Sequence, residues 1–417
     1  MTPDLVNRLT QQMQYEFDRT APPDGFPKFH DIPVQRFTSD EFWELEQKYL
    51  WPRSWVIAGR SEDIPNVGDF FTFDDLGVPI LLIRGRDLQV RAFYNTCQHR
   101  GAPVVRESSG TSKLLRCQYH SWSYDIDSGQ LVSVPDERDF VDLDKTERCL
   151  PTISCAVWDN WIFVNQDANA ISLAEHIGSI ADEMSEFQGQ SLRTVAKQSE
   201  IVPCNWKVTA EAFLEVYHFR HIHSRNGESL LDNRGATMGL LPNGCSRMVT
   251  PFSKTSYTAL GMKNWDDYKH VVLPGFTNIE TVNDMVRCTS TAFGIFPNLI
   301  TPVAAYGFPF ITFWPIDKQT TRIDWTHYAP IDFDPREGLP ANWQARLDNF
   351  ALIMQEDFWN MAPMQKSLES PAMRGMPINY QERRIWNFHE EVDRLIGIER
   401  IPEELRVEQL LAPYIER

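Results

Sequence analysis

Two short segments of the chain each hold one cysteine and one histidine. Cys97 precedes His99 by two positions, and Cys117 precedes His120 by three. At this spacing a thiolate and an imidazole in one tight loop can turn toward the same point, so two loops supply two sulfur and two nitrogen donors. A tetrahedral zinc ion accepts this donor set, and so does a [2Fe–2S] cluster in which histidines replace two cysteines on one iron. Zinc motifs keep like ligands together, whereas here they alternate, which favours the cluster over zinc.

A second group of possible metal ligands follows about a hundred residues later and contains Glu215, His218, His221 and His223. In a regular helix Glu215 and His218 lie roughly 60° apart, on one face, and His221 extends that face. His223 converges with His218 only where the helix ends or distorts between them. Spacing alone therefore leaves both His221 and His223 open as the partner of His218.

A carboxylate for the same site is expected from residues 342 to 368, which have the pattern of a long amphipathic helix. Its apolar stripe consists of Trp343, Leu347, Phe350, Met354, Phe358 and Met361. Asp357 falls within about 20° of Phe350, inside the stripe, whereas Glu356 falls about 120° from it. A buried carboxylate is costly unless it is paired or binds a metal. Two histidines and one carboxylate are typical of non-haem iron that activates dioxygen, with Glu215 or Asp357 as that carboxylate. An ion pair of Asp357 with an arginine or lysine is the alternative.

The elements that must position these residues indicate two domains in a chain of 417 residues. Residues 1–44 are expected to form a helix (Leu5 to Phe17) and a proline-rich arm lying on another surface, with a further helix from Ser39 to Tyr49 that Ser39 caps. Residues 45–166 read as a small antiparallel β domain. Its predicted strands are Trp55–Ala58, Phe70–Phe73, Ile80–Ile83, Val90–Tyr94, Leu114–Cys117 and Trp161–Val164.

Residues 167–417 are predicted to form a larger domain that begins with a helical connector at 168–195. Neighbouring strands are expected at Leu299–Ala305, Ile311–Pro315 and Ile323–Tyr328. Helices are expected at 342–368 and at 378–396. The predicted fold class is therefore α+β.

Composition excludes several classes of function. The formal net charge of −17 argues against nucleic-acid binding. No apolar run approaches the length of a membrane span, and no apolar secretory segment is visible at the N-terminus, so a cytoplasmic location without membrane contact is expected. The seven cysteines are expected to be thiols and metal ligands rather than disulfides.

The first donor set resembles the Rieske family. The segments Cys97-x-His99-Arg100-Gly101 and Cys117-x-x-His120-x-Trp122 are similar to its two cluster-binding boxes. The resemblance implies that Cys97 and Cys117 hold one iron and that His99 and His120 hold the other.

Two features place the resemblance within the family. The respiratory branch has an extra cysteine in each box, and here Ala102 and Tyr119 occupy those positions, so the similarity is to the oxygenase and ferredoxin branch. Ser121 stands where that branch usually has glycine, a small change that we expect the cluster to tolerate.

The second donor set resembles the catalytic-iron segment of Rieske oxygenase α subunits. That likeness covers Asn205-Trp206-Lys207, then Glu211-x-Phe213-x-Glu215-x-Tyr217-His218-x4-His223, and the late segment Gln355-Glu356-Asp357. It implies that His218, His223 and Asp357 bind iron, and that His221 does not. Glu215 is implied to bridge an iron-ligating histidine and a cluster-ligating histidine across a subunit boundary. Ala212 departs from the asparagine of many relatives.

The resemblance also implies a fold and a reaction. The catalytic domain is expected to be a helix-grip, START-like fold, with an antiparallel sheet wrapped on a long helix. The chain would be a terminal mono- or dioxygenase with a Rieske [2Fe–2S] cluster and mononuclear Fe(II), acting on a small molecule with O2. It would hydroxylate, dihydroxylate or oxidatively demethylate that substrate.

The implied partners are a flavin reductase, a ferredoxin or both, which pass on electrons from NAD(P)H. The sequence contains neither GxGxxG nor GxxxxGK[ST], so the nucleotide is expected to bind the reductase. A homotrimer, with or without a small β subunit, is the expected assembly. The alternative is a Rieske electron carrier or ligand-binding module whose second site is not catalytic.

The substrate pocket is expected beside the iron segment and the strands. Its predicted walls are Phe213, Leu214, Phe293, Ile295, Leu299, Phe308 and Phe310. These side chains are apolar, which favours a hydrophobic or aromatic substrate.

Overall fold

The computed structural model describes residues 1–225, 228–254, 267 and 272–416. The chain forms two compact units, one spanning Trp51–Glu175 and the other combining Met1–Leu50 with His176–Arg417. The sequence had placed the small domain at 45–166. The larger unit retains residues up to 50 because the buried carboxylate of Glu46 accepts a hydrogen bond from Lys207 Nζ at 2.6 Å. The smaller unit extends past 166 because Trp55 Nε1 donates to the carbonyl of Ile171.

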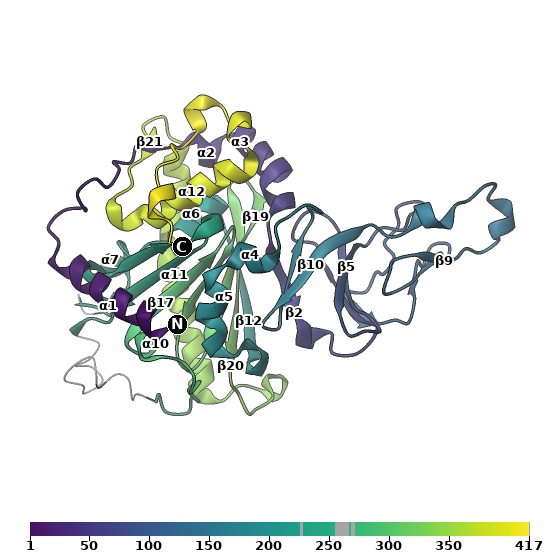
Figure 1. The fold of residues 1–417 in the computed structure, drawn as a ribbon, viewed down its shortest axis with the longest axis horizontal. Helices are drawn as coiled ribbons and strands as arrows, with labels where there is room; N and C mark the ends of the chain where they lie inside the picture. The colour runs from purple at the N-terminus through teal and green to yellow at the C-terminus, as the bar shows by residue number, and fades with distance from the viewer. Residues whose placement is uncertain (226–227, 255–266, 268–271, 417) are drawn as a thin grey trace. The chain divides into compact units, whose positions relative to one another are not determined.

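The smaller unit is a β structure with a buried core (Figure 1). Its seven-stranded antiparallel sheet has the order β2-β11-β10-β5-β4-β3-β6. These strands are β2 (Val56–Arg60), β3 (Asp69–Phe73), β4 (Ile80–Arg84), β5 (Val90–Tyr94), β6 (Ser109–Thr111), β10 (Thr152–Trp158) and β11 (Trp161–Asn165). A second sheet joins β7 (Leu115–Arg116), β8 (Ser123–Tyr124) and β9 (Leu131–Ser133). The six strands predicted from sequence are all present.

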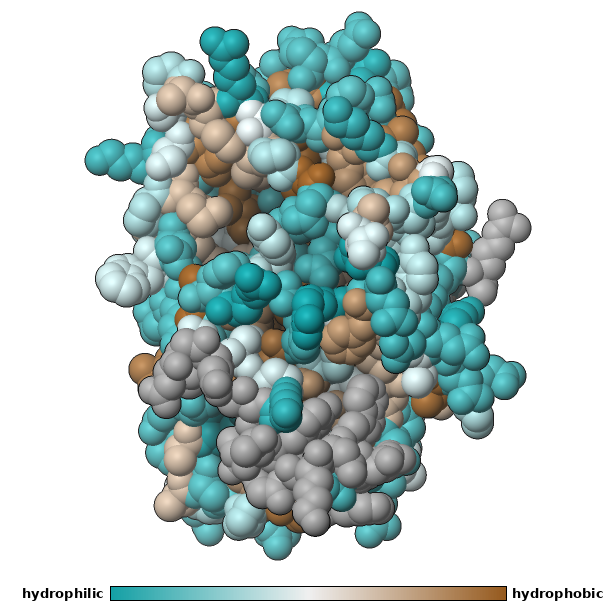
Figure 2. Space-filling view, turned by 90° about the vertical axis from the view of Figure 1, so that its left-hand side faces the viewer, coloured by the Kyte–Doolittle hydropathy of each residue, from teal (hydrophilic) through white to brown (hydrophobic). Residues whose placement is uncertain are grey.

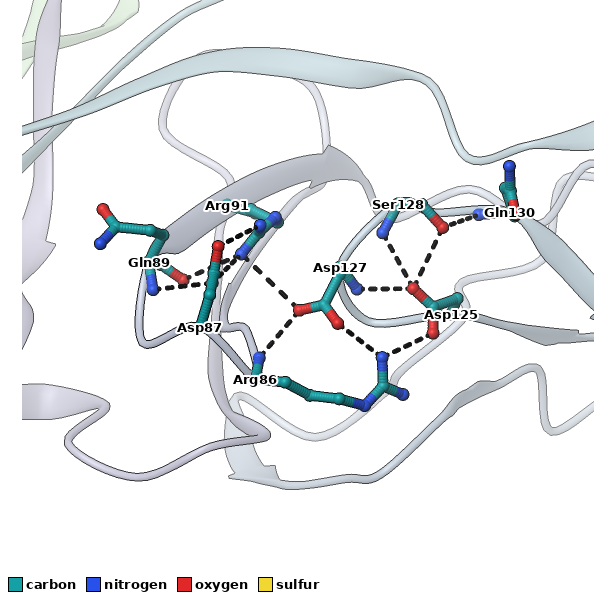
Figure 3. Close-up of polar contacts among 8 residues, drawn as sticks. All are labelled: Arg86, Asp87, Gln89, Arg91, Asp125, Asp127, Ser128 and Gln130. Carbon is teal, nitrogen blue, oxygen red and sulfur yellow. Dashed lines mark hydrogen bonds and ion pairs between the residues drawn. The ribbon is translucent and has the colours of Figure 1, made fainter.

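A network of charged side chains connects the two sheets of this unit (Figure 3). Arg86, in the turn between β4 and β5, donates to Asp125 Oδ2 at 2.8 Å, and its backbone N–H donates to Asp127 Oδ1 at 2.8 Å. Arg91 of β5 lies 3.7 Å from the same Asp127 carboxylate. Hydrogen bonds from Arg86 and Ser128 outweigh partial burial and lower the pKa of Asp125 to about 2. The network therefore attaches the β8–β9 hairpin, which follows the second Cys/His segment, to the larger sheet.

The larger unit contains a second seven-stranded antiparallel sheet, ordered β12-β20-β19-β18-β17-β16-β15. Its strands are β12 (Arg193–Val202), β15 (Thr237–Leu240), β16 (Ser246–Pro251), β17 (Thr289–Ile295), β18 (Leu299–Val303), β19 (Phe308–Asp317) and β20 (Thr320–Ala329). Two short pairs complete the β structure, β1 (Ile32–Pro33) with β21 (Gly375–Met376) and β13 (Ser224–Arg225) with β14 (Glu228–Ser229). The predicted neighbours β18, β19 and β20 are confirmed.

Helices of the larger unit pack on both faces of this sheet, as described below. The described helices of the chain are α1 (Pro3–Asp18), α2 (Gln35–Thr38), α3 (Asp40–Leu45), α4 (Leu173–Ile177), α5 (Ser179–Met184), α6 (Trp206–Glu211), α7 (Phe219–Ile222), α10 (Asp284–Cys288), α11 (Ala341–Leu368) and α12 (Arg383–Ile396), and α4 spans the boundary between the two units. No helix among these described residues combines the length and apolar character that crossing a bilayer requires.

Strand alternation assigns a different partner to each face of the sheet. On one face Trp325 and His327 of β20 contact Phe358 and Phe350 of α11, with ring centroids 6.1 and 4.9 Å apart. Tyr328 is the next residue and therefore points to the opposite face. That opposite face is covered by the segment around α5 and by α1, through the cluster of Leu9, Met13, Val249 and Met285. An antiparallel sheet packed on one long helix confirms the predicted α+β class.

The N-terminal residues pack on their own unit rather than projecting as an arm. Leu9 and Met13 are buried against the sheet, as described above. In the proline-rich segment the ring of Phe26 meets Tyr380 edge-on, and that of Phe29 stacks on Trp386 at 4.8 Å. This aromatic packing supplies the surface onto which the predicted arm folds. Ser39 caps α3 as expected, accepting from Phe42 N at 3.2 Å.

Figure 2 shows one face of the molecule, where most described side chains are hydrophilic and hydrophobic ones lie lower between them. This distribution is that of a face in contact with water.

Candidate metal centres and active site

The two Cys/His segments are loops of the same construction. In the first, Cys97 N donates to the carbonyl of Ala102 and Gly101 N donates to that of Cys97, at 2.8 and 3.0 Å. In the second, Cys117 N donates to Trp122 O and Ser121 N donates to Cys117 O, at 2.9 and 2.8 Å. Gly101 and Ser121 occupy equivalent places and both have positive φ, 74° and 61°. Ser121 therefore adopts a left-handed conformation that glycine would accept at lower cost.

The side chains of these loops fit a two-iron cluster. Cys97 and Cys117 are buried free thiols. The rings of His99 and His120 have centroids 4.6 Å apart, and His99 Nδ1 is buried without a hydrogen-bond partner. A single zinc ion would gather all four donors around one point. Among the described residues, however, the one group with three such donor atoms within 4.8 Å of one another is His218, His223 and Asp357, and it includes none of these four side chains. A pair of thiols for one iron and a pair of imidazoles for the other matches a [2Fe–2S] cluster better than a single tetrahedral ion.

Tyr124 supports the first loop from within the core. Its hydroxyl lies 3.2 Å from Cys97 Sγ and accepts a hydrogen bond from Gln98 N at 2.9 Å. A ligand thiolate carries no proton, so with a cluster bound the tyrosine O–H would donate to the sulfur. Hydrogen bonds to ligand sulfurs stabilise the more negative, reduced cluster and raise its potential.

The second donor set lies where the helical pattern breaks. Helix α6 ends at Glu211, residues 212–218 are not helical, and α7 is a single turn from Phe219 to Ile222. The expected common helical face of Glu215 and His218 is thus wrong, because neither residue lies inside a helix. The Glu215 carboxylate instead accepts from the backbone N–H groups of Tyr217 and His218 and from His218 Nδ1.

The end of α7 determines which histidine joins His218. His223 follows the last helical residue with φ −99° and ψ 30°, which turns its ring back toward His218. His221 stays on the helix and is exposed, with its ring centroid 6.4 Å from that of Tyr217. The structure therefore brings His223, and not His221, to His218.

Three side chains converge at this point. His218 Nε2 and His223 Nε2 lie 3.3 Å apart, and Asp357 Oδ1 lies 3.6 Å from the first and 3.2 Å from the second. Ligand atoms about 2.1 Å from one ion and at right angles are roughly 3 Å apart, so these separations fit a shared metal. The predicted apolar stripe of α11 is buried together with Asp357. Two histidines and one carboxylate on one side leave the other side for exogenous ligands.

Both histidines of the triad have a carboxylate at the outer ring nitrogen. His218 Nδ1 contacts Glu215, and His223 Nδ1 lies 2.8 Å from Glu356 Oε2. Burial lowers the pKa of His223, but hydrogen bonds to Asp357 and Glu356 outweigh it and the net shift is upward. Outer carboxylates fix the orientation of a ligand imidazole and increase its basicity. The contact of Glu356 with His223 was not predicted from the sequence, because Glu356 lies off the buried stripe of α11. Its position next to Asp357 was the one feature of the sequence that could have indicated it.

Comparison with protein families agrees with these two sites. Residues 182–398, more than half of the chain, match the ring hydroxylating alpha subunit (catalytic domain), and residues 54–153 match the Rieske [2Fe-2S] domain. The chain belongs to the ring-hydroxylating alpha subunit family. This confirms the resemblance found in the sequence, together with the expected Rieske cluster and mononuclear iron of this alpha subunit.

Curated relatives of the alpha subunit include both monooxygenases and dioxygenases. The carnitine monooxygenase oxygenase subunit of Escherichia coli (strain K12) is 27% identical over 205 residues, 49% of this chain and 54% of that protein. Benzene 1,2-dioxygenase subunit alpha of Pseudomonas putida is 33% identical over 193 residues, 45% of this chain and 43% of that protein. The alignments thus span about half the length of these relatives.

Solved structures share the fold of the alpha subunit. The quaternary ammonium Rieske monooxygenase CntA in complex with L-carnitine superposes with a TM-score of 0.70 at 20% identity, covering 90% of this chain and 99% of that one. Naphthalene 1,2-dioxygenase from Rhodococcus sp. bound to indole gives 0.69 at 18% identity, covering 95% and 99%.

A cavity of about 350 Å³ lies beside the triad of this alpha subunit. Its wall includes Phe219, whose ring centroid is 4.6 Å from that of His223, and Phe350, two turns before Asp357 on α11. Pro302 and Pro309 come from the face of the sheet that packs on α11. The volume is at the lower end of the range for small-molecule sites.

None of the seven predicted pocket-wall residues lines this cavity. Five of the seven lie on the opposite face of the sheet: Phe293, Ile295, Leu299, Phe308 and Phe310. Phe308 packs on Phe187 at 5.1 Å, and the residue paired with Phe293, Arg247, forms an ion pair with Glu183 of α5. These five side chains are core. Phe213 lies on the α11 face, where its ring is 5.3 Å from Phe313, and Leu214 lies near Gly294 on that face. Neither lines the cavity described above.

Tyr124→Phe is expected to lower the midpoint potential of the cluster by about 50 mV, because it removes one hydrogen bond of about 1 kcal/mol from a one-electron couple. The substitution conserves shape, so cluster content should not change. Redox titration of the visible spectrum measures the shift. Tyr119→Phe, which alters an exposed tyrosine of the second loop, is the matched control, and equal potentials in both variants would contradict this role of Tyr124.

Glu356→Ala is expected to weaken iron binding at the triad by about 10- to 100-fold while the cluster is retained, because His223 loses its orienting carboxylate. Iron competition against a chelator, with cluster absorbance as internal reference, measures the effect. Gln355→Ala, at an exposed neighbouring position of α11, should bind iron normally. Unchanged affinity in Glu356→Ala would show that the contact with His223 does not support iron binding.

Proposed function

We propose that this protein is the terminal oxygenase of a multi-component system and that it oxidises a small, hydrophobic, aromatic molecule. The cavity beside the triad, with its largely apolar wall, supports this class of substrate. The observation that carries the proposal is the convergence of His218, His223 and Asp357 next to that cavity, in a chain that also has two thiols and two imidazoles in a separate unit. One-electron delivery and dioxygen activation need two different centres.

The bound groups would supply the difficult chemistry, with the cluster providing single electrons and the mononuclear iron providing open positions for dioxygen. The protein's own residues orient the ligand imidazoles and shield the reaction site from water. Glu215 and Glu356 hold the two imidazoles at fixed tautomers, with Nε2 of each ring directed to the metal position. Phe219 and Phe350 place an apolar wall beside the triad, which excludes water from the reacting carbon.

Glu215 is the proposed connection between the two kinds of centre. Its carboxylate contacts His218 at Nδ1, and we propose that it also meets a cluster-ligating histidine of a neighbouring subunit. That arrangement requires a head-to-tail assembly, for which a homotrimer, with or without a small β subunit, is the proposed form. Electrons would come from NAD(P)H through a separate reductase, with or without a ferredoxin.

The proposal covers hydroxylation, dihydroxylation and oxidative demethylation, because one set of iron ligands serves all three. The names of the relatives include both a monooxygenase and a dioxygenase.

Metal content and single-turnover oxidation test the proposed function. Fully loaded protein is expected to contain three irons per chain and, after chemical reduction and exposure to O2, to convert an added aromatic compound into an oxygenated product. Mass spectrometry with ¹⁸O2 identifies the oxygen source. Two irons per chain with an intact cluster spectrum, or no labelled product with three irons, would favour an electron carrier or ligand-binding module instead.

A further inference from the structure

The cavity beside the triad has an unusual distribution of charge. Its apolar wall is interrupted by two arginines, Arg287 and Arg346, and no aspartate or glutamate occurs among the described residues that line it. A cavity with this lining attracts a negatively charged group and repels a cation.

Neither arginine has a carboxylate partner among the described residues. The guanidinium of Arg346 lies over the ring of Tyr306, 5.3 Å from its centroid. Arg287 donates only to backbone carbonyls, those of Val282, Ile279 and Glu280. Two other arginines of this unit do pair with acids, Arg36 with Asp393 and Arg247 with Glu183, each at 2.6 Å. The charge at the cavity is thus left for a ligand to neutralise.

A buried histidine without a polar partner lies behind the same wall, although it does not line the cavity itself. His327 is 3% exposed, and neither of its ring nitrogens has a partner. It pairs across the sheet with Pro309 and meets Phe350 edge-on at 4.9 Å, and both of those residues line the cavity. Burial, with a smaller contribution from Arg346, lowers the pKa of His327 to about 3. It therefore stays neutral and can donate one hydrogen bond.

The position of Arg346 on α11 sets the shape of the ligand. Eleven residues separate it from Asp357, which corresponds to roughly 16 Å along a helix. Phe350 stands between them on the same wall. An anionic group held by Arg346 and a carbon presented to the triad must therefore lie at opposite ends of an elongated apolar body.

We propose that the substrate is an elongated amphipathic anion, an apolar body of about two rings with a terminal carboxylate or sulfonate, and that Arg346 binds the anionic end. The inference rests on the proposed function, since it assumes that the opposite end is the one oxidised. Arg346 is here a specificity-determining residue, and Arg287 contributes to the same positive potential.

Matched ligands of one shape test the proposal. The probes are biphenyl-4-carboxylate, biphenyl-4-carboxamide and biphenyl-4-trimethylammonium, titrated calorimetrically into protein that holds both metal centres. The carboxylate is expected to bind at least ten-fold more tightly than the amide, and the cation more weakly than either. Benzoate, which is too short to reach from Arg346 to the triad, is expected to bind at least ten-fold more weakly than the biphenyl acid.

Variants of Arg346 separate the effect of its charge on binding from any effect on folding. Arg346→Met should raise the Kd of the acid at least ten-fold and that of the amide less than three-fold, whereas Arg346→Lys should keep most of the preference. Arg374→Met, at an exposed arginine remote from the cavity wall, makes the same change in net charge and should have no effect. Iron content and cluster absorbance verify that each variant is intact.

Single-turnover oxidation distinguishes failure of the anion proposal from failure of the proposed oxygenase function. Equal binding of acid and amide, with product formed from the amide, would overturn the anion proposal and leave the oxygenase assignment standing. Arginine-dependent binding of the acid to protein with three irons, but without any oxygenated product, would overturn the oxygenase assignment instead.

Discussion

Asp357→Ala is expected to leave two irons per chain instead of three and to reduce oxygenated product by at least about 10³-fold, or about 4 kcal/mol of transition-state stabilisation. Asp357 contributes the only carboxylate oxygen among the three converging donor atoms. Without it two neutral imidazoles face a divalent cation, one of them already partly exposed to solvent. Iron analysis with simultaneous measurement of cluster absorbance separates the loss of one centre from loss of both.

The control for this substitution is Asp348→Ala, which removes an exposed carboxylate from the same helix. It should retain three irons and full activity. If Asp357→Ala also retained the third iron, the triad would not be the iron site, and Asp357 would have to be explained as a buried ion-pair partner of the histidines.

Glu215→Gln is expected to retain all three irons but to slow electron transfer from the reduced cluster to the catalytic centre by at least about 100-fold, or about 2.7 kcal/mol. Glutamine keeps an oxygen that can accept from the backbone of Tyr217 and His218, so the loop before α7 should keep its conformation. It removes the negative charge that the His218 imidazole contacts. Stopped-flow measurement of cluster reoxidation by O2, with an added aromatic compound, gives the rate directly.

Two comparisons make the interpretation of Glu215 specific. Glu200→Gln, at an exposed position of β12, changes the net charge equally and should reoxidise at the normal rate. Glu215→Ala should show the same slow transfer with a further loss of iron affinity, because the loop also loses its cap. A normal reoxidation rate in Glu215→Gln would remove this carboxylate from the electron path.

The sequence alone determined the donor chemistry and much of the local structure. The alternating Cys/His pairs predicted the contents of the two loops, since ligand type and loop spacing are local properties. The stripe on α11 predicted that Asp357 is buried, because helical periodicity holds along the 28 residues of this helix. Short runs of β-forming residues bounded by turn residues were also found close to their predicted limits, as for β4 and β5.

Tertiary structure decided what depends on irregular backbone and distant contacts. Spacing left His221 and His223 open, and His223 is the one that reaches His218 because α7 ends after one turn; no periodic rule specifies where a short helix ends. Glu356 joins the site because His223 reaches it from 133 residues away in the chain. Five of the predicted pocket-wall residues lie on the face away from the cavity because β17, β18 and β19 are apolar and buried on both faces, so the sequence does not distinguish the faces. Which face meets α11 is fixed only by long-range packing, and that packing places Arg346 and His327, rather than the five phenylalanine, isoleucine and leucine side chains, beside the cavity.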